Sequence, residues 1–172
     1  MSSKKGYVLG AHLRSVIRHL PTQALELGEY QTLAESIDPE AWYDWDIYVT
    51  MSRTIAARMP SRSIVQIGTQ LVTHSRDLFV SQGFDSIDKV FSDASAVFRA
   101  NSKDVDESDD MKTVFFEPGH AIIEVGGSHV PELIEGFIYG FIEAFEGKLL
   151  SLHGKLKKRA PDLYEYDIRY ES

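Results

Sequence analysis

Cysteine is absent from this 172-residue sequence. Its absence excludes a disulfide scaffold, a cysteine-ligated zinc or iron–sulfur site and a cysteine nucleophile. No apolar run approaches ~18 residues, so we expect no membrane span. Positive charge is also scarce, with 18 lysines and arginines against 26 aspartates and glutamates. The net charge of −8 disfavours a nucleic-acid partner, because phosphate binding requires an excess of positive charge.

The N-terminal segment lacks the apolar core of a signal peptide. His12, Arg14, Arg18 and His19 interrupt its hydrophobic residues. Such a segment is too polar to direct export, so we predict a cytoplasmic location.

The composition and length are those of a globular protein. Hydrophobic residues make up 43% of the sequence and aromatic residues 11%, which argues against disorder. The length suits a single domain over 1–172. We divide this domain into a helical part, 1–101, and a sheet part, 111–172.

Apolar residues recur at helical spacing throughout the first part. Asp38 and Pro39 are typical of a helix start, and Asp85 or Ser86 is a suitable cap for a later helix. The helices predicted in this part cover 7–20, 22–36, 40–59, 62–81 and 86–100. A polar, acidic segment over 101–110 then predicts a solvated loop.

The second part has a different pattern. Pro118 and Gly119 separate two runs rich in β-forming residues, which is a hairpin signal. The last run alternates apolar and polar residues without error, as a half-buried strand does. The predicted elements are strands over 112–117, 121–125, 148–157 and 164–171, with a helix over 130–146. The fold class is therefore α+β: an N-terminal helical layer, then a four-stranded antiparallel sheet in the order strand–strand–helix–strand–strand.

The helix predicted over 130–146 has a broad apolar arc opposite an acidic side. Glu135, Tyr139 and Glu143 fall on this acidic side. One interpretation is a solvated face on a helix that packs over the sheet. The other is a partner-binding stripe with Tyr139 as its anchor, since tyrosine is favoured at interfaces.

Motifs for metal or catalytic chemistry are missing. The six histidines form no metal-binding helix motif; we expect His12 and His19 to be surface residues and His74 to be buried and hydrogen-bonded. The acidic residues of 104–110 lack the spacing of a calcium loop. Neither a phosphate-binding loop nor a Gly-x-Ser-x-Gly motif is present. We therefore predict no metal, no cofactor and no enzymatic activity.

The order of elements and several short segments together resemble a known superfamily. This superfamily joins haem nitric-oxide/oxygen-binding (H-NOX) domains, 4-vinyl reductase type ligand-binding domains and TRAPP transport subunits. In its short sequence patterns the chain is most similar to uncharacterised haem-free bacterial proteins of the myxobacterial type. The segments that carry the resemblance are 6–10, 42–48, 132–140 and 166–170.

The resemblance also shows where this sequence departs from its relatives. H-NOX domains carry a proximal histidine on the helix before the sheet, whereas 86–100 contains none. Their Tyr-x-Ser-x-Arg motif for the porphyrin carboxylates corresponds to 125–129, which has neither the tyrosine nor the arginine. Only His129 or His74 could serve as an alternative haem ligand. The cysteines of the 4-vinyl reductase type domains and of some TRAPP subunits have no counterpart.

The resemblance implies a non-enzymatic bacterial regulatory or signalling domain that binds a small apolar ligand or a partner protein, and that forms a homodimer. Its pocket should lie between the helical layer and the sheet; otherwise the same aromatic residues are ordinary core. The alternatives are a pure interaction adaptor that uses Glu135, Tyr139 and Glu143, and a haem-based gas sensor. The candidate pocket residues are Trp45, Tyr48, Phe91, Phe98, Phe137 and Phe141.

Overall fold

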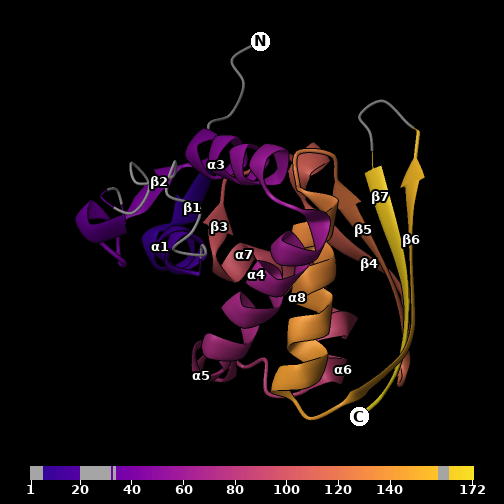
Figure 1. Ribbon diagram of the computed structural model, residues 1–172. Coiled ribbons are helices and arrows are strands. Elements are labelled where there is room, and N and C mark those ends of the chain that lie inside the picture. Colours follow the sequence, from indigo (N-terminus) through magenta and orange to yellow (C-terminus); the bar gives the residue numbers. More distant parts are fainter. Residues whose placement is uncertain (1–5, 20–31, 33, 159–162) are drawn as a thin grey trace.

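A four-stranded antiparallel sheet forms one side of the molecule (Figure 1). The computed structural model describes residues 6–19, 32, 34–158 and 163–172. The strand order is β4-β5-β7-β6. The strands are β4 (Met111–Glu117), β5 (His120–Gly126), β6 (Lys148–Lys157) and β7 (Leu163–Glu171). The prediction of an α+β fold with an antiparallel sheet is confirmed.

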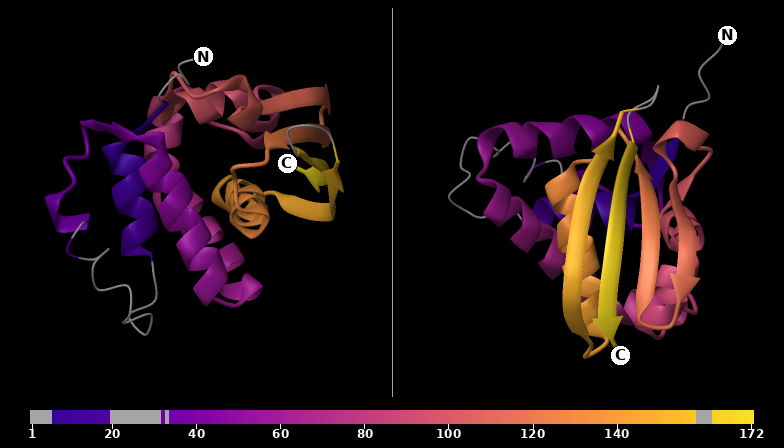
Figure 2. Two further views of the ribbon diagram at one scale, coloured as in Figure 1. Left: turned by 90° about the horizontal axis from the view of Figure 1, so that it is seen from above. Right: turned by 90° about the vertical axis from the view of Figure 1, so that its right-hand side faces the viewer.

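The alternating pattern of β7 explains how the sheet divides the molecule. Tyr166, Ile168 and Tyr170 are buried, while Arg169 between them is exposed. Because successive side chains of a strand point to opposite faces, one face of the sheet belongs to the core. Figure 2 (right) shows the other face of the sheet, with the helices behind it.

Helix α8 (Pro131–Ala144) connects the two strand pairs and lies beside α4 (Ser61–His74) between the sheet and the N-terminal elements (Figure 1). Glycines let the two helix backbones meet. A Cβ atom added to Gly68 would lie 2.5 Å from the Leu133 carbonyl oxygen and 2.9 Å from the Gly136 Cα. Real Cβ atoms do not approach other atoms this closely, so any larger residue would force α4 and α8 apart.

A second, three-stranded sheet corrects the purely helical prediction for the first part. Its order is β2-β1-β3, with β1 (Tyr7–Leu9) between β2 (Trp42–Asp44) and β3 (Ser102–Lys103). The helix predicted over 7–20 therefore begins at Gly10, as α1 (Gly10–Arg18). Val8 is fully buried and pairs with partners distant in sequence, and this pairing overrides the local helical pattern.

The helix predicted over 40–59 also begins later than expected. Asp38 accepts a hydrogen bond from the Glu40 amide in a turn and caps no helix there. The helix is α3 (Trp45–Arg58), and the side chain of Asp44 accepts from the Asp46 amide at its start. The helix predicted over 22–36 lies almost wholly outside the described residues.

Two predicted helices are each interrupted. The helix over 62–81 divides at Ser75 into α4 and α5 (Arg76–Ser81). The helix over 86–100 divides at Asp93 into α6 (Ile87–Ser92) and α7 (Ala94–Ala100). The backbone of Asp93 is not helical, and its side chain caps α7 by accepting a hydrogen bond from the Ala96 amide. Ser86 caps α6 by accepting a hydrogen bond from the Lys89 amide.

The acidic segment over 101–110 is not simply a solvated loop. It contains β3 and a 3-10 turn, η2 (Glu107–Asp109). Asp110 is 6% exposed, and its carboxylate receives a hydrogen bond from Arg99 at 2.7 Å. A buried carboxylate requires such a partner.

Two clusters of buried side chains form the core, one around the N-terminal helices and one between α8 and the four-stranded sheet. Phe137 packs against both clusters, which makes it the residue at their junction. Within the described part of the chain, no helix combines the length and apolarity needed to cross a membrane.

Candidate functional site

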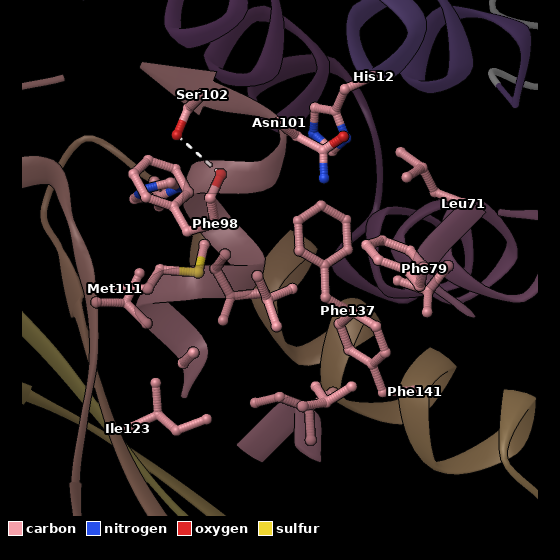
Figure 3. Close-up of a pocket in the computed structure, with 18 of the residues that line it drawn as sticks. His12, Leu71, Phe79, Phe98, Asn101, Ser102, Met111, Ile123, Phe137 and Phe141 are labelled. Atoms are coloured by element: carbon pink, nitrogen blue, oxygen red, sulfur yellow. Dashed lines mark hydrogen bonds between the residues drawn. The ribbon is translucent and has the colours of Figure 1, made fainter. Parts of the chain in front are cut away.

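A cavity of about 90 Å³ lies at the junction of the two clusters (Figure 3). Side chains from both layers line it. The helical layer contributes residues from α1, α3, α4, α5, α6 and α7, and the sheet contributes residues from β4 and β5. Helix α8 supplies the wall between them through Ile134, Phe137, Ile138 and Phe141.

All six residues that the sequence suggested as pocket lining do line this cavity. They come from four separate helices: α3, α6, α7 and α8. The six are Trp45, Tyr48, Phe91, Phe98, Phe137 and Phe141. Their convergence fulfils the geometric condition for a binding site, while their role in binding stays a prediction.

Four aromatic rings cluster at one side of the cavity. The ring centroid of Trp45 lies 4.8 Å from that of Tyr48, 5.5 Å from that of Phe98 and 5.6 Å from that of His129. Phe98 and His129 are themselves 5.5 Å apart, with their rings edge to face. Such edge-to-face contacts are favourable for aromatic pairs and fix the orientation of His129.

His12 belongs to the same cluster and is half-buried, so the prediction of a partly exposed surface histidine holds only in part. Its ring lies 5.6 Å from that of Tyr48 and 6.1 Å from that of Phe137. Burial, and to a smaller extent the neighbouring His129, lower the pKa of His12 from 6.5 to about 4. His12 is therefore neutral at pH 7.

His129 is 5% exposed and has one fixed hydrogen bond. Its Nε2 lies 2.8 Å from the carbonyl oxygen of Asp109, and because a carbonyl can only accept, Nε2 carries the proton. Burial lowers the pKa of His129, although Asp109 and Asp110 act in the opposite direction. The ring is thus neutral, and its Nδ1 is a bare acceptor.

Two buried nitrogens on the cavity lining have no hydrogen-bond partner among the described residues. They are Nδ1 of His129 and Nε1 of Trp45. Trp45 is 6% exposed, so bulk water does not reach its N–H group. Buried polar groups are nearly always paired, and an exception therefore marks a place where a partner is expected.

The cavity has a polar end and an apolar end. In Figure 3, His12, Asn101 and Ser102 lie above Phe137, whereas Ile123 lies below it. Ser102 is already satisfied, because its hydroxyl donates to the Phe98 carbonyl at 2.8 Å.

Aromatic and aliphatic side chains line the rest of the cavity. The rings of Phe79 and Phe141 meet edge to face with centroids 4.9 Å apart. Phe79, His12, Asn101, Ser102 and His129 were not among the predicted pocket residues.

The three candidate partner-binding residues lie on α8. Tyr139 is 39% exposed and Glu143 is exposed, while Glu135 is half-buried. Burial raises the pKa of Glu135, and the charge of Glu132 raises it further. At 100° per residue, this stripe lies on the side of α8 opposite Phe137 and Phe141.

The remaining predictions about histidine chemistry have mixed outcomes. His74 is hydrogen-bonded as predicted, but it is exposed rather than buried: its Nδ1 lies 2.8 Å from Nε2 of His19, with the rings stacked. Among the described residues, no three histidines, aspartates or glutamates come together in a way that could hold a metal ion.

Comparisons with known proteins give matches only among solved structures. No family model matches the sequence. No curated protein matches it either. The structure is similar to a Cs H-NOX mutant that carries the unnatural amino acid 4-cyano-L-phenylalanine, with a TM-score of 0.51, 13% identity and coverage of 79% of this chain and 78% of that one. It is also similar to a mutant of the T. Tengcongensis H-NOX, with a TM-score of 0.50, 14% identity and 79% coverage of each chain. At this identity the likeness shows an H-NOX-like fold and nothing beyond it.

The residues at the cavity do not fit a haem group. No histidine occurs on α6 or α7, the helices that precede the four-stranded sheet. Among the described residues that line the cavity, there is no lysine or arginine to neutralise the porphyrin carboxylates.

Proposed function

We propose that this chain, with its H-NOX-like fold, is a non-enzymatic bacterial regulatory domain that binds a small apolar molecule without haem. The observation that carries the proposal is the cavity between the helical layer and the sheet. Its aromatic lining comes from elements far apart in sequence, and its polar groups are few. Such a concave, largely apolar site with a few convergent polar groups is typical of small-molecule binding.

Ordinary core packing explains the cavity less well. Protein interiors are packed as densely as organic crystals. An unfilled volume costs roughly 24 cal/mol per Å³, so a cavity of about 90 Å³ would cost about 2 kcal/mol of stability if it had no use. A ligand that fills the cavity would recover this free energy.

Toluene binding to the purified full-length chain, measured by calorimetry, tests the proposal. Ala94 lines the cavity and is 7% exposed, so Ala94→Leu would fill part of the space. Ala96, on the same helix α7, does not line the cavity, so Ala96→Leu is the matched control. We expect wild-type protein and the control to bind toluene and Ala94→Leu to lose binding. Equal binding by both variants, or no binding to the wild type, would refute the proposal.

A second candidate function is partner binding through Glu135, Tyr139 and Glu143. The exposed aromatic ring of Tyr139 among acidic side chains favours it. A partner with a basic surface would complement this stripe. The double variant Tyr139→Ala with Glu143→Lys should then abolish capture of such a partner, whereas Ala94→Leu should retain it. If both variants fail to capture the partner, misfolding is the explanation. If both variants still capture it, the stripe is not the binding surface.

Helix α8 is the physical link between the two candidate functions. Its cavity side carries Phe137 and Phe141, and its opposite side carries Tyr139. A ligand that shifts α8, together with the helix α4 in backbone contact with it, would therefore change the surface that a partner contacts. Homodimer formation and a cytoplasmic location stay predictions; native mass spectrometry would measure the oligomeric state and any bound ligand together.

A further inference from the structure

We propose that His19 and His74 form a two-histidine site for a divalent transition-metal ion, at the point where helices α1 and α4 end. The two residues are 55 positions apart in the sequence, yet Nε2 of His19 lies 2.8 Å from Nδ1 of His74. Their rings are stacked, with centroids 4.8 Å apart. Neither histidine lines the cavity, so this inference does not depend on the proposed function.

His19 already makes the supporting interaction that a metal-binding histidine needs. Its Nδ1 lies 2.7 Å from the carbonyl oxygen of Ser15, one helical turn earlier. Because a carbonyl can only accept, Nδ1 carries the proton, and in the neutral ring Nε2 presents a lone pair. Metal-ligating histidines almost always donate their other N–H group in this way, since the bond fixes the tautomer and the orientation of the ring.

His74 supplies the second ligand after a change of tautomer. With Nε2 of His19 as the acceptor, Nδ1 of His74 is the donor of the hydrogen bond between the rings. When the metal binds, this proton is exchanged through solvent for one on Nε2 of His74, and Nδ1 coordinates the ion. The ring stays neutral and no net proton is released. Because His74 is exposed, water reaches it for this exchange.

The separation of the two nitrogens suits neighbouring ligands of one ion. Imidazole nitrogens at about 2.0 Å from a metal are about 2.9 Å apart when they subtend about 90°, and about 3.3 Å apart in a tetrahedral site. The observed 2.8 Å is closest to the first arrangement. Square-planar and tetragonal sites of this kind are typical of Cu²⁺ and Ni²⁺, whereas Zn²⁺ would require the rings to move apart.

The two helix ends also favour a cation at this point. His19 directly follows α1, and His74 is the last residue of α4. The terminal carbonyl groups of a helix carry partial negative charge, which stabilises a nearby positive ion. The cation nearest in sequence to His74, Arg76, is engaged by α8: it donates to the Ala144 carbonyl at 2.9 Å and lies over the ring of Phe145.

Water completes the coordination of such an ion. Two protein ligands are consistent with the finding that, in the part of the chain that the structure describes, no three histidines, aspartates or glutamates could hold a metal together. The ion would join the ends of α1 and α4 and would stabilise the folded chain by mass action.

Calorimetric titration of the untagged full-length chain with Ni²⁺ tests the site. We expect one ion to bind per chain. His19→Gln and His74→Gln should each weaken binding by about tenfold or more, because each variant leaves a single ligand and loses the advantage of chelation. His153→Gln removes an exposed histidine on β6 and should bind as the wild type does. Mg²⁺ prefers oxygen ligands and should not bind.

A second measurement needs no variant. Paramagnetic Cu²⁺, added in small amounts to the wild type, should broaden the NMR signals of the His19 and His74 ring protons before those of His153. The two-histidine site is overturned if the wild type binds no Ni²⁺, if both glutamine variants bind as the wild type does, or if only one of them loses affinity. Should a variant fail to fold, the NMR result decides: broadening of one ring alone, or of His153 equally, overturns the site.

Discussion

Acid should destabilise this protein through His12. Its pKa falls from 6.5 in the unfolded chain to about 4 in the folded protein, because burial among aromatic rings disfavours the imidazolium. Between these two values the unfolded state binds the proton and the folded state does not. Stability is therefore fully present above pH 6.5 and is lost as the pH falls towards 4.

The size of the effect follows from the difference in pKa. Each pKa unit corresponds to about 1.4 kcal/mol, so the shift of His12 is worth up to about 3 kcal/mol in the free energy of unfolding. About 2 kcal/mol of this should already be lost at pH 5. His129 acts in the same direction, because burial lowers its pKa as well.

Urea unfolding at pH 7 and pH 5 measures this loss, with His12→Phe as the test variant. The phenylalanine keeps a ring between Tyr48 and Phe137 and removes the proton-binding site. The wild type should lose about 2 kcal/mol more than His12→Phe between the two pH values, and contributions from carboxylates should cancel in this difference. His153 is exposed on β6, so His153→Gln is a control that should behave as the wild type. Equal losses in wild type and His12→Phe would refute the burial argument.

Two further substitutions test the packing that holds the cavity in place. Gly136→Ala should lower the free energy of unfolding by about 1–3 kcal/mol, because the added Cβ would overlap the α4 backbone. In an unobstructed helix the same change stabilises the protein. A rise in the urea midpoint would therefore contradict the close contact between α4 and α8. Tyr170→Phe should cost about 1 kcal/mol, since it removes the 2.6 Å hydrogen bond from the Tyr170 hydroxyl to Asp88. An unchanged midpoint for Tyr170→Phe would show that this bond adds no net stability.

The sheet part was more predictable than the helical part for a physical reason. In β7 the alternation of Tyr166, Ile168 and Tyr170 with polar residues is local, and it directly encodes which face is buried. The strand Tyr7–Leu9 has no such local signal. It exists because Val8 pairs with Tyr43 on one side and Ser102 on the other, and a window of neighbouring residues contains neither partner.

The residues of the candidate site also divide into those that a local sequence pattern predicts and those that depend on distant segments of the chain. Phe137 and Phe141 could be predicted because they lie on the apolar arc of a strongly periodic helix. His12 could not, because its burial depends on Tyr48 from another helix and on Phe137 from the far end of the chain. The unpaired state of His129 Nδ1 depends in turn on the Asp109 carbonyl, which fixes the tautomer.

The architecture around the cavity also indicates which wall can adapt to a ligand. Gly68 and Gly136 bring α4 and α8 into backbone contact, so these two helices have little freedom to separate. The opposite wall consists of α6 and α7, two short helices that Asp93 interrupts and that contribute Phe91 and Phe98. Helices of this length depend on tertiary contacts for their stability. A ligand larger than the cavity would therefore displace α6 and α7 first. Thr113 of β4 is hydrogen-bonded to the backbone of both helices, so this displacement would reach the four-stranded sheet through β4.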